Sequence, residues 1–238
     1  MIIMRVSFLL EVYFFTMSQL PLDIVVCDHD GLGKGNIHLW HKSLAMRKLI
    51  VKMSMSMDGF VSGAKGEKDW VFKTGDEESA AWSVAAIQQG GLIIMGRTTF
   101  ETLSAYWPTA TGPFAKPMNE IPKAVFTQKG FKGIDAGHAE QSPAMASWAG
   151  ARVFDGDLAA EIKGLKAEPG KPIVAIGGAG FVQSLIATGL VDEYHLAIHP
   201  VALGSGLPIF SGVEMPLYLR LVDTKVFPKG VIAKIYGV

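Results

Sequence analysis

The stretch "KPIVAIGGAGFVQSLIATGLVDEYHLAIHPVALGSGLPIF", Lys171–Phe210, decides the fold of this protein. Its apolar run "IVAI" ends at Gly177-Gly178-Ala179-Gly180, and a segment with one apolar face, carrying Phe181, follows at once. This pattern indicates a buried strand that enters a helix through a glycine turn. At such a turn a ligand can approach the backbone, and the N–H groups of the helix start attract anions. The pattern alone fits a closely packed turn equally well, because "GGAGFVQ" matches neither G-x-G-x-x-G nor a P-loop.

A second turn repeats this layout. In "IIMGRTTFE" a strand ends at Gly96, and a capping box at Thr98 and Glu101 is predicted to open a helix. Arg97 stands beside the hydroxyls of Thr98 and Thr99, and the planar fork of an arginine suits a phosphate monoester. An arginine on a solvated helix start is the alternative. Two such turns in one sheet favour a dinucleotide, and the separate arginine indicates the 2′-phosphate of NADPH.

The remaining pattern gives the fold class. Alternation over residues 48–57 predicts a strand that ends in a turn at Asp58-Gly59, and a capping box at Thr74 and Glu77 predicts the next helix. Further strands are predicted at 92–95, 123–127, 152–154 and 173–176, with a helix at 158–166 and a final pair of strands joined at 228–230. Strands that alternate with helices predict an α/β fold: a mostly parallel central sheet flanked by helices, with a C-terminal antiparallel hairpin.

Composition limits the partners. The 238 residues carry 22 basic and 22 acidic side chains, so the net charge is zero and neither nucleic acid nor an anionic membrane is expected as a partner. No apolar run approaches the ~18 residues of a membrane span. A single cysteine excludes an intrachain disulfide and fits a reducing cytoplasm. We therefore expect a cytoplasmic protein with a small-molecule substrate.

The first 45 residues differ from the rest and are interpreted as an appendage, disordered or the product of an upstream start, before one domain at 46–238. Cys27, His29, His38 and His41 match no standard zinc spacing, so no metal is expected there.

Several segments of the sequence together resemble a known family. The segments "MSMDGFVSG", "MGRTTFE", "AVFTQK" and above all the quoted stretch resemble the dihydrofolate reductase-like superfamily, specifically the C-terminal reductase domain of the riboflavin-biosynthesis deaminase/reductase, RibD. The resemblance covers Met46 to Val238. It implies an NADPH-binding α/β domain, often a homodimer, that passes hydride to a pyrimidine-like or pterin-like substrate, as a 5-amino-6-(5-phosphoribosylamino)uracil reductase does.

The resemblance also implies site residues. The adenosine side of NADPH would be held by Gly96, Arg97, Thr98, Thr99 and Thr127, and the pyrophosphate by Gly177, Gly178, Ala179, Gly180 and Phe181. Asp58 is the candidate catalytic residue, although Asp-Gly after a strand is also an ordinary turn. Ser205 in "LGSG" is expected to be a loop residue, and Met55 and Met57 are interpreted as core rather than as the floor of the site.

Two departures leave alternatives open. Dihydrofolate reductases have an acidic residue shortly after a Pro-Trp, whereas here Asp76 and Glu77 are only rough positional substitutes for it, and helix-start charge is their expected role. The zinc deaminase signature needs more than one cysteine, so a bifunctional enzyme is excluded. The alternatives to a reductase are a non-catalytic NADPH or nucleotide-binding module of the same fold and a weak dihydrofolate reductase.

Overall fold

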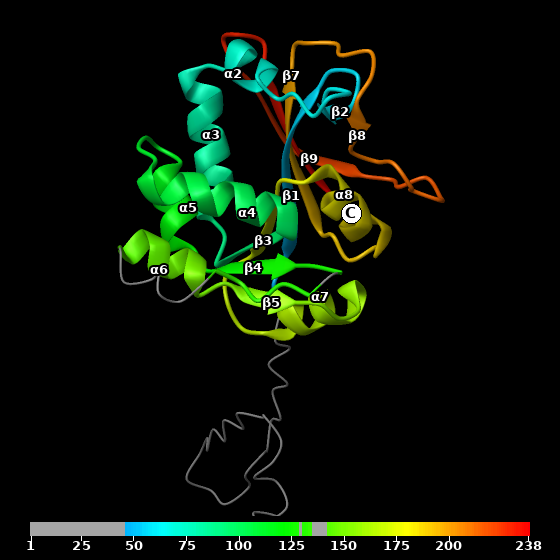
Figure 1. Cartoon of the computed structure of the whole chain (residues 1–238). Coiled ribbons are helices and arrows are strands. Elements are labelled where there is room, and N and C mark those ends of the chain that lie inside the picture. The colour runs from blue at the N-terminus through cyan, green and yellow to red at the C-terminus, as the bar shows by residue number, and fades with distance from the viewer. Residues whose placement is uncertain (1–45, 129, 135–141) are drawn as a thin grey trace, which may run out of the picture. The chain divides into compact units, whose positions relative to one another are not determined.

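The computed structural model describes residues 46–128, 130–134 and 142–238, and these belong to one compact unit (Figure 1). The proposed appendage, with Cys27 and its three neighbouring histidines, lies outside the described residues. Within the described part of the chain, no helix is both long enough and apolar enough to cross a bilayer.

The architecture is an eight-stranded sheet in the order β5-β4-β3-β6-β1-β7-β10-β9. The first six strands of this order are parallel, whereas β10 runs antiparallel to β7 and β9 antiparallel to β10. The predicted mostly parallel sheet with a C-terminal hairpin is therefore confirmed. The strands are β1 (Leu49–Ser56), β3 (Leu92–Gly96), β4 (Lys123–Phe126), β5 (Arg152–Phe154), β6 (Ile173–Ile176), β7 (Glu193–His199), β9 (Arg220–Val226) and β10 (Ile232–Gly237).

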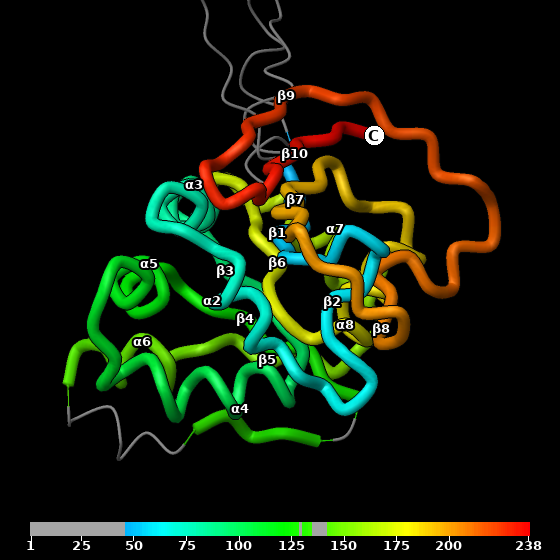
Figure 2. The backbone as a smooth tube through the Cα atoms, turned by 90° about the horizontal axis from the view of Figure 1, so that it is seen from above, coloured from blue at the N-terminus to red at the C-terminus, as the bar shows by residue number. Residues whose placement is uncertain are grey.

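Helices cover both faces of the sheet (Figure 2). On one face lie α3 (Glu77–Gln88), α4 (Arg97–Tyr106), α5 (Ala115–Glu120) and α6 (Pro143–Ala149), and on the other lie α7 (Leu158–Ala167) and α8 (Ala179–Ala187). Two short helices, α2 (Trp70–Thr74) and the 3-10 turn η1 (Trp107–Thr109), complete the helical set of the described residues. A separate two-stranded sheet pairs β2 (Phe60–Ser62) with β8 (Leu207–Pro208).

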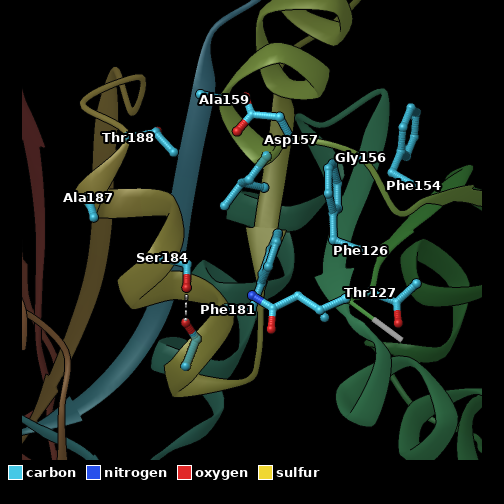
Figure 3. A pocket seen from close by; sticks show the side chains of 14 residues that line it. Phe126, Thr127, Phe154, Gly156, Asp157, Ala159, Phe181, Ser184, Ala187 and Thr188 are labelled. Carbon is cyan, nitrogen blue, oxygen red and sulfur yellow. Dashed lines mark hydrogen bonds between the residues drawn. The ribbon is translucent and has the colours of Figure 1, made fainter. Parts of the chain in front are cut away.

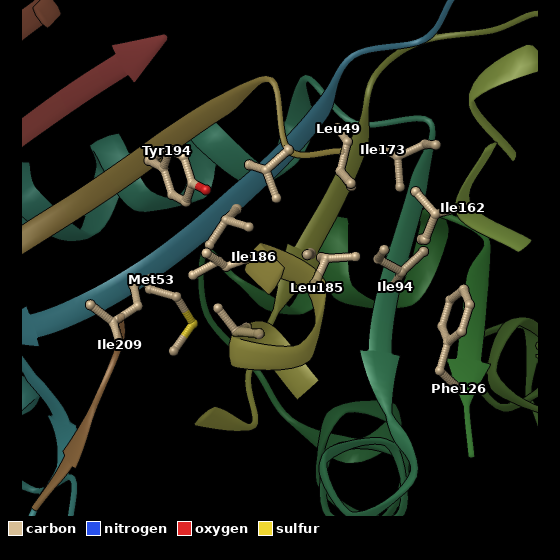
Figure 4. Packing of buried hydrophobic residues seen from close by; sticks show 14 of the residues in the cluster. Leu49, Met53, Ile94, Phe126, Ile162, Ile173, Leu185, Ile186, Tyr194 and Ile209 are labelled. Atoms are coloured by element: carbon tan, nitrogen blue, oxygen red, sulfur yellow. The ribbon is translucent and has the colours of Figure 1, made fainter. Parts of the chain in front are cut away.

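The core has two main layers, one on each face. Residues of β1, β3 and β6 that point to the α7–α8 face, such as Leu49, Ile94 and Ile173, pack on Leu185 and Ile186 of α8 (Figure 4). The alternate residues of the same strands pack with the helices of the other face. This double burial explains why "IVAI" is apolar throughout, because a central parallel strand has no solvent face.

Both predicted capping boxes are wrong. Helix α3 begins one turn after Thr74: Asp76 is its N-cap and exchanges hydrogen bonds with Ser79, whereas Thr74 belongs to the end of α2. Helix α4 has Gly96 as its N-cap with no side-chain cap bond, so Thr98 lies inside the helix. In both places a threonine and a glutamate have the i,i+3 spacing of a capping box, but the helix begins at a different residue.

Candidate functional site

A cavity of about 780 Å³ opens where the parallel strands β3, β4 and β5 end. The carboxyl ends of parallel strands are the usual ligand site of open α/β sheets. Its lining comes from the strand ends, the start of α7 and one side of α8: Gly96, Phe126, Thr127, Gln128, Phe154, Gly156, Asp157, Leu158, Ala159, Gly180, Phe181, Ser184, Ala187 and Thr188. Of the predicted cofactor residues, the structure brings Gly96, Thr127, Gly180 and Phe181 together in this cavity.

Stacked aromatic rings form one wall of the cavity (Figure 3). The Phe126 ring lies 5.1 Å from that of Phe154, at an interplanar angle of 15°, and 5.3 Å from that of Phe181, at 27°. The three rings come from β4, β5 and α8, which meet only in the folded sheet. An aromatic wall of this kind offers apolar contact to a planar ring.

The polar groups in the cavity are mostly neutral. None of the described lining residues is a lysine, arginine or histidine. Asp157 caps α7 by accepting a hydrogen bond of 2.8 Å from the Ala160 amide, and the Ser184 hydroxyl donates to the Gly180 carbonyl oxygen at 3.0 Å. The described side chains that line the cavity therefore offer no cationic partner for a phosphate, and they suit an uncharged group with a few hydrogen-bonding edges.

The glycine turn after β6 has a packing role. Gly177 and Gly178 have positive φ values, 73° and 38°. A Cβ on Gly178 would lie 2.8 Å from Thr99 Oγ1, and a Cβ on Gly177 would overlap the Thr99 methyl group. The glycines thus leave space for the Thr99 side chain of α4. The two predicted phosphate turns are therefore in contact with each other. Ala179 is buried at the start of α8.

Arg97 lies outside the cavity lining. Its Nε donates to Glu101 Oε1 at 2.8 Å, an i,i+4 pair in α4, and its guanidinium carbon lies 5.0 Å from the Phe131 ring centroid. Thr98 follows on the exposed side of α4, where its carbonyl oxygen accepts from Thr102. A phosphate at Arg97 would therefore compete with the carboxylate of Glu101.

Asp58 joins two loops. Its carboxylate accepts hydrogen bonds from the amides of Leu203, at 3.0 and 3.1 Å, and Gly204, at 2.7 Å. The pKa of Asp58 lies below its ordinary value because the Ser56 hydroxyl and these amides donate to the charged form. The "SMDG" turn therefore holds the loop that contains Ser205, which agrees with a loop role for "LGSG". A catalytic role for Asp58 stays a prediction.

The two other expected acids serve α3. Asp76 accepts from the amides of Ser79 and Lys229, both within 3 Å, and Glu77 is the first helical residue. The helix-start role predicted for them is confirmed. Met55 packs against the core as expected, but Met57 is 67% exposed, so its interpretation as core is wrong.

Sequence reasoning missed a polar cluster at the carboxyl end of β7. Thr74 donates its hydroxyl to the Trp70 carbonyl oxygen at 2.7 Å and contacts His199 Nδ1 at 2.8 Å. The Trp70 ring meets His199 edge-on at 5.3 Å. Burial, together with the charge of Lys52, lowers the pKa of His199 to about 4, so the ring is neutral at pH 7. Since the Thr74 proton is used on Trp70, His199 is assigned as the donor at Nδ1.

Known proteins are similar to this chain in sequence and in fold. The family model described as the RibD C-terminal domain matches residues 47–233. The uncharacterized protein YyaP of Bacillus subtilis (strain 168) is 30% identical over 194 residues, covering 82% of this chain and 96% of YyaP. A pyrimidine reductase-like protein from Corynebacterium diphtheriae aligns with a TM-score of 0.58 at 17% identity, over 81% of this chain and 92% of its own. Dihydrofolate reductase from Enterococcus faecalis, complexed with NADP(H), aligns with a TM-score of 0.52 at 14% identity, over 80% of this chain and 95% of its own. The fold is thus dihydrofolate reductase-like.

Proposed function

Because this chain belongs to the RibD C-terminal domain family, we propose that it is an NADPH-dependent reductase of a small nitrogen heterocycle, resembling 5-amino-6-(5-phosphoribosylamino)uracil reductase. One observation carries the proposal: the cavity at the strand ends has a stacked aromatic wall and adjoins both glycine turns. The dihydrofolate reductase of the same fold is described with NADP(H) bound. Family and geometry together favour a nicotinamide dinucleotide over a single phosphate.

Different residues of this chain fit different parts of the cofactor. The wall of Phe126 and Phe181 would hold a planar base by stacking, and Thr127 and Gln128 offer hydrogen bonds to its edge or to a ribose. The amides of the turn at 177–180 would receive the pyrophosphate, and Arg97 the 2′-phosphate. When bound, NADPH supplies the hydride.

The chain's own residues would position the two reactants and exclude water. The Asp58 bonds to Leu203 and Gly204 fix the loop after β7 against the loop after β1. The Thr74–His199 contact fixes α2 against the end of β7. These two links hold the carboxyl ends of β1 and β7, which lie further along the sheet than the strands of the aromatic wall. There the acceptor would meet the nicotinamide.

The test is NADPH oxidation, followed at the absorbance of the reduced nicotinamide, with aminopyrimidinones, pterins and dihydrofolate as acceptors. NADPH and NADH affinities are titrated on the same preparation. We expect tighter binding of NADPH and turnover with at least one pyrimidine or pterin. Absence of NADPH binding would contradict the proposal as a whole.

A non-catalytic NADPH-binding module is the second candidate function. The observation that favours it is that the carboxylates of Asp58 and Asp76 already accept backbone amides, so neither is placed as the acid of a folate reductase. This candidate predicts NADPH binding without oxidation by any acceptor. Turnover of dihydrofolate alone would instead support the third candidate, a weak dihydrofolate reductase.

A further inference from the structure

A carboxylate at the cavity between β3, β4 and β5 keeps one oxygen free among the described residues. Asp157 is the only charged side chain in the described lining of this cavity. Its Oδ1 accepts the hydrogen bond of 2.8 Å from the Ala160 amide that caps α7, whereas Oδ2 accepts none from the part of the chain that the structure describes. The cap holds the carboxylate in place, so Oδ2 is a positioned acceptor for a ligand.

The hydroxyl groups that line the cavity use their protons on carbonyl oxygens of α8. Ser184 donates to Gly180 at 3.0 Å, and Thr188 donates to Leu185 at 2.6 Å. Apart from the two residues that follow β4, the polar side chains of the described lining can therefore only accept hydrogen bonds from a ligand. The part of a ligand that lies near the free carboxylate oxygen is favoured when it brings a donor.

The aromatic wall indicates which part of the cofactor enters the cavity. The rings of Phe126 and Phe181, 5.3 Å apart, offer apolar contact to a planar base. Figure 3 shows Asp157 and Thr127 on opposite sides of the Phe126 ring. A nucleoside that lies along this wall has its base toward one of these two polar residues and its ribose toward the other.

The charge of NADPH favours one of the two orientations. The adenosine ribose of NADPH carries a 2′-phosphate, which the carboxylate of Asp157 would repel. Thr127 is neutral, and Gly96, which also lines the cavity, directly precedes Arg97. The phosphate is therefore favoured near Gly96 and Thr127, and the base is favoured near Asp157.

From this arrangement we infer that Asp157 Oδ2 accepts a hydrogen bond from the amino group of the cofactor's adenine, so that Asp157 selects a 6-amino purine over a 6-oxo purine. The inference rests on the NADPH binding proposed above. The amino group is the exocyclic donor of adenine, whereas a 6-oxo purine presents a carbonyl oxygen at the same position. Two acceptors would then face each other without a proton between them, which costs binding free energy.

The test is titration of the full chain with NADPH and with its deamino analogue, in which hypoxanthine replaces adenine. The wild type is expected to bind NADPH about tenfold more tightly than the analogue. Asp157→Asn keeps an oxygen to cap α7 and replaces only the free oxygen by an NH2 group, which can donate to a carbonyl oxygen. This variant is expected to lose the preference for NADPH or to reverse it.

The matched control is Asp155→Asn. Asp155 is exposed, stands two residues before Asp157 and is not among the residues that line the cavity. Its substitution removes the same charge and is expected to leave the ratio of the two affinities unchanged, and thermal unfolding checks that both variants stay folded. Equal affinities in the wild type, an unchanged ratio in Asp157→Asn, or the same shift in both variants would each overturn this inference alone. Absence of binding of either cofactor would overturn the proposed function with it.

Discussion

Thr99 occupies the space that a side chain at Gly178 would need, since a Cβ there would lie 2.8 Å from Thr99 Oγ1. The turn after β6 and the start of α4 are therefore packed against each other before any ligand arrives. Two predicted phosphate sites that are 80 residues apart in sequence form one surface. Their glycines are required by the fold, whatever else they bind.

This packing predicts that Gly177→Ala destabilises the protein. The residue has φ 73°, and its Cβ would overlap the Thr99 methyl group, so we expect a loss of about 1–3 kcal/mol in the free energy of unfolding. Thr99→Ser removes that methyl group and should recover part of the loss in the double variant, as measured by urea unfolding. Gly164→Ala, in α7 with open space around its Cβ, is the control and should be neutral or stabilising. Equal losses with and without Thr99→Ser would leave only the backbone conformation as the cause.

Arg97 and Glu101 give opposite predictions for cofactor binding. Arg97→Ala should weaken NADPH by about ten- to a hundredfold, the effect of about 1.5–3 kcal/mol, and leave NADH nearly unchanged. Glu101→Gln removes the carboxylate that pairs with Arg97 and should strengthen NADPH binding by up to about fivefold, since an exposed pair contributes up to about 1 kcal/mol. Titration of both cofactors checks this. Equal loss of NADPH and NADH in Arg97→Ala would assign Arg97 to the fold.

Asp58→Asn separates positioning from catalysis. An amide has one acceptor oxygen in place of two, so it cannot keep the bonds to both Leu203 and Gly204 with the same strength, and we expect a lower melting temperature. The catalytic hypothesis expects instead an unchanged melting temperature and a kcat/KM reduced by about 10²–10⁴. Thermal unfolding and acceptor kinetics on one preparation distinguish the two. The amides of Leu203 and Gly204 donate to the mutated side chain, so weaker bonds would also be visible as faster hydrogen exchange of these two amides.

The sheet could be predicted from sequence because its signals are local. An apolar run such as 173–176 must be buried, and the turn at 228–230 can join only two neighbouring strands. Helices α2, α5 and α6 were missed, since they are short and follow tertiary packing rather than a long amphipathic period.

The site was predicted less completely, for a physical reason. The glycine turns are visible in sequence, but the aromatic wall is built from three separate segments. Phe126 and Phe154 are each the last residue of a strand, and this shared position was the available signal. The sequence does not reveal the His199 cluster, because the spacing of Thr74 and Glu77 predicts a helix cap, whereas Thr74 contacts His199 in the structure.

The last prediction concerns Lys52, a lysine in the middle of β1 that is 9% exposed. In the alternating sequence of 48–57 this lysine stands between the apolar positions, where an exposed side chain is expected. The structure buries both faces of β1, and Lys52 with them. On its face of the sheet lie His195 and His199 of β7 and Trp82 of α3, whose ring centroid is 6.0 Å from Lys52 Nζ. Burial lowers the pKa of Lys52 to about 8.

The sign of the pH effect follows from the two protonation states. Between pH 8 and about 10.5 the unfolded chain holds this proton while the folded chain has released it, so the free energy of unfolding should rise with pH across that window. Below pH 8 both states are charged, and the buried charge costs the folded state about 3 kcal/mol. Lys52→Met should therefore stabilise the protein by up to that amount at pH 7 and remove the rise between pH 8 and 10.5.

The matched control is Lys48→Met, just before the same strand. Lys48 is exposed and pairs with Glu193 at 2.7 Å, which raises its pKa, so its removal should not stabilise the protein. Urea unfolding of the wild type and both variants from pH 7 to 10 tests this prediction. His199 is neutral throughout that range because burial lowers its pKa to about 4, and burial also lowers the pKa of His195 below its ordinary value. If Lys52→Met lowers stability at pH 7, the lysine is held by interactions that outweigh its burial, and a role for its charge in the neighbouring His199 cluster becomes the better explanation.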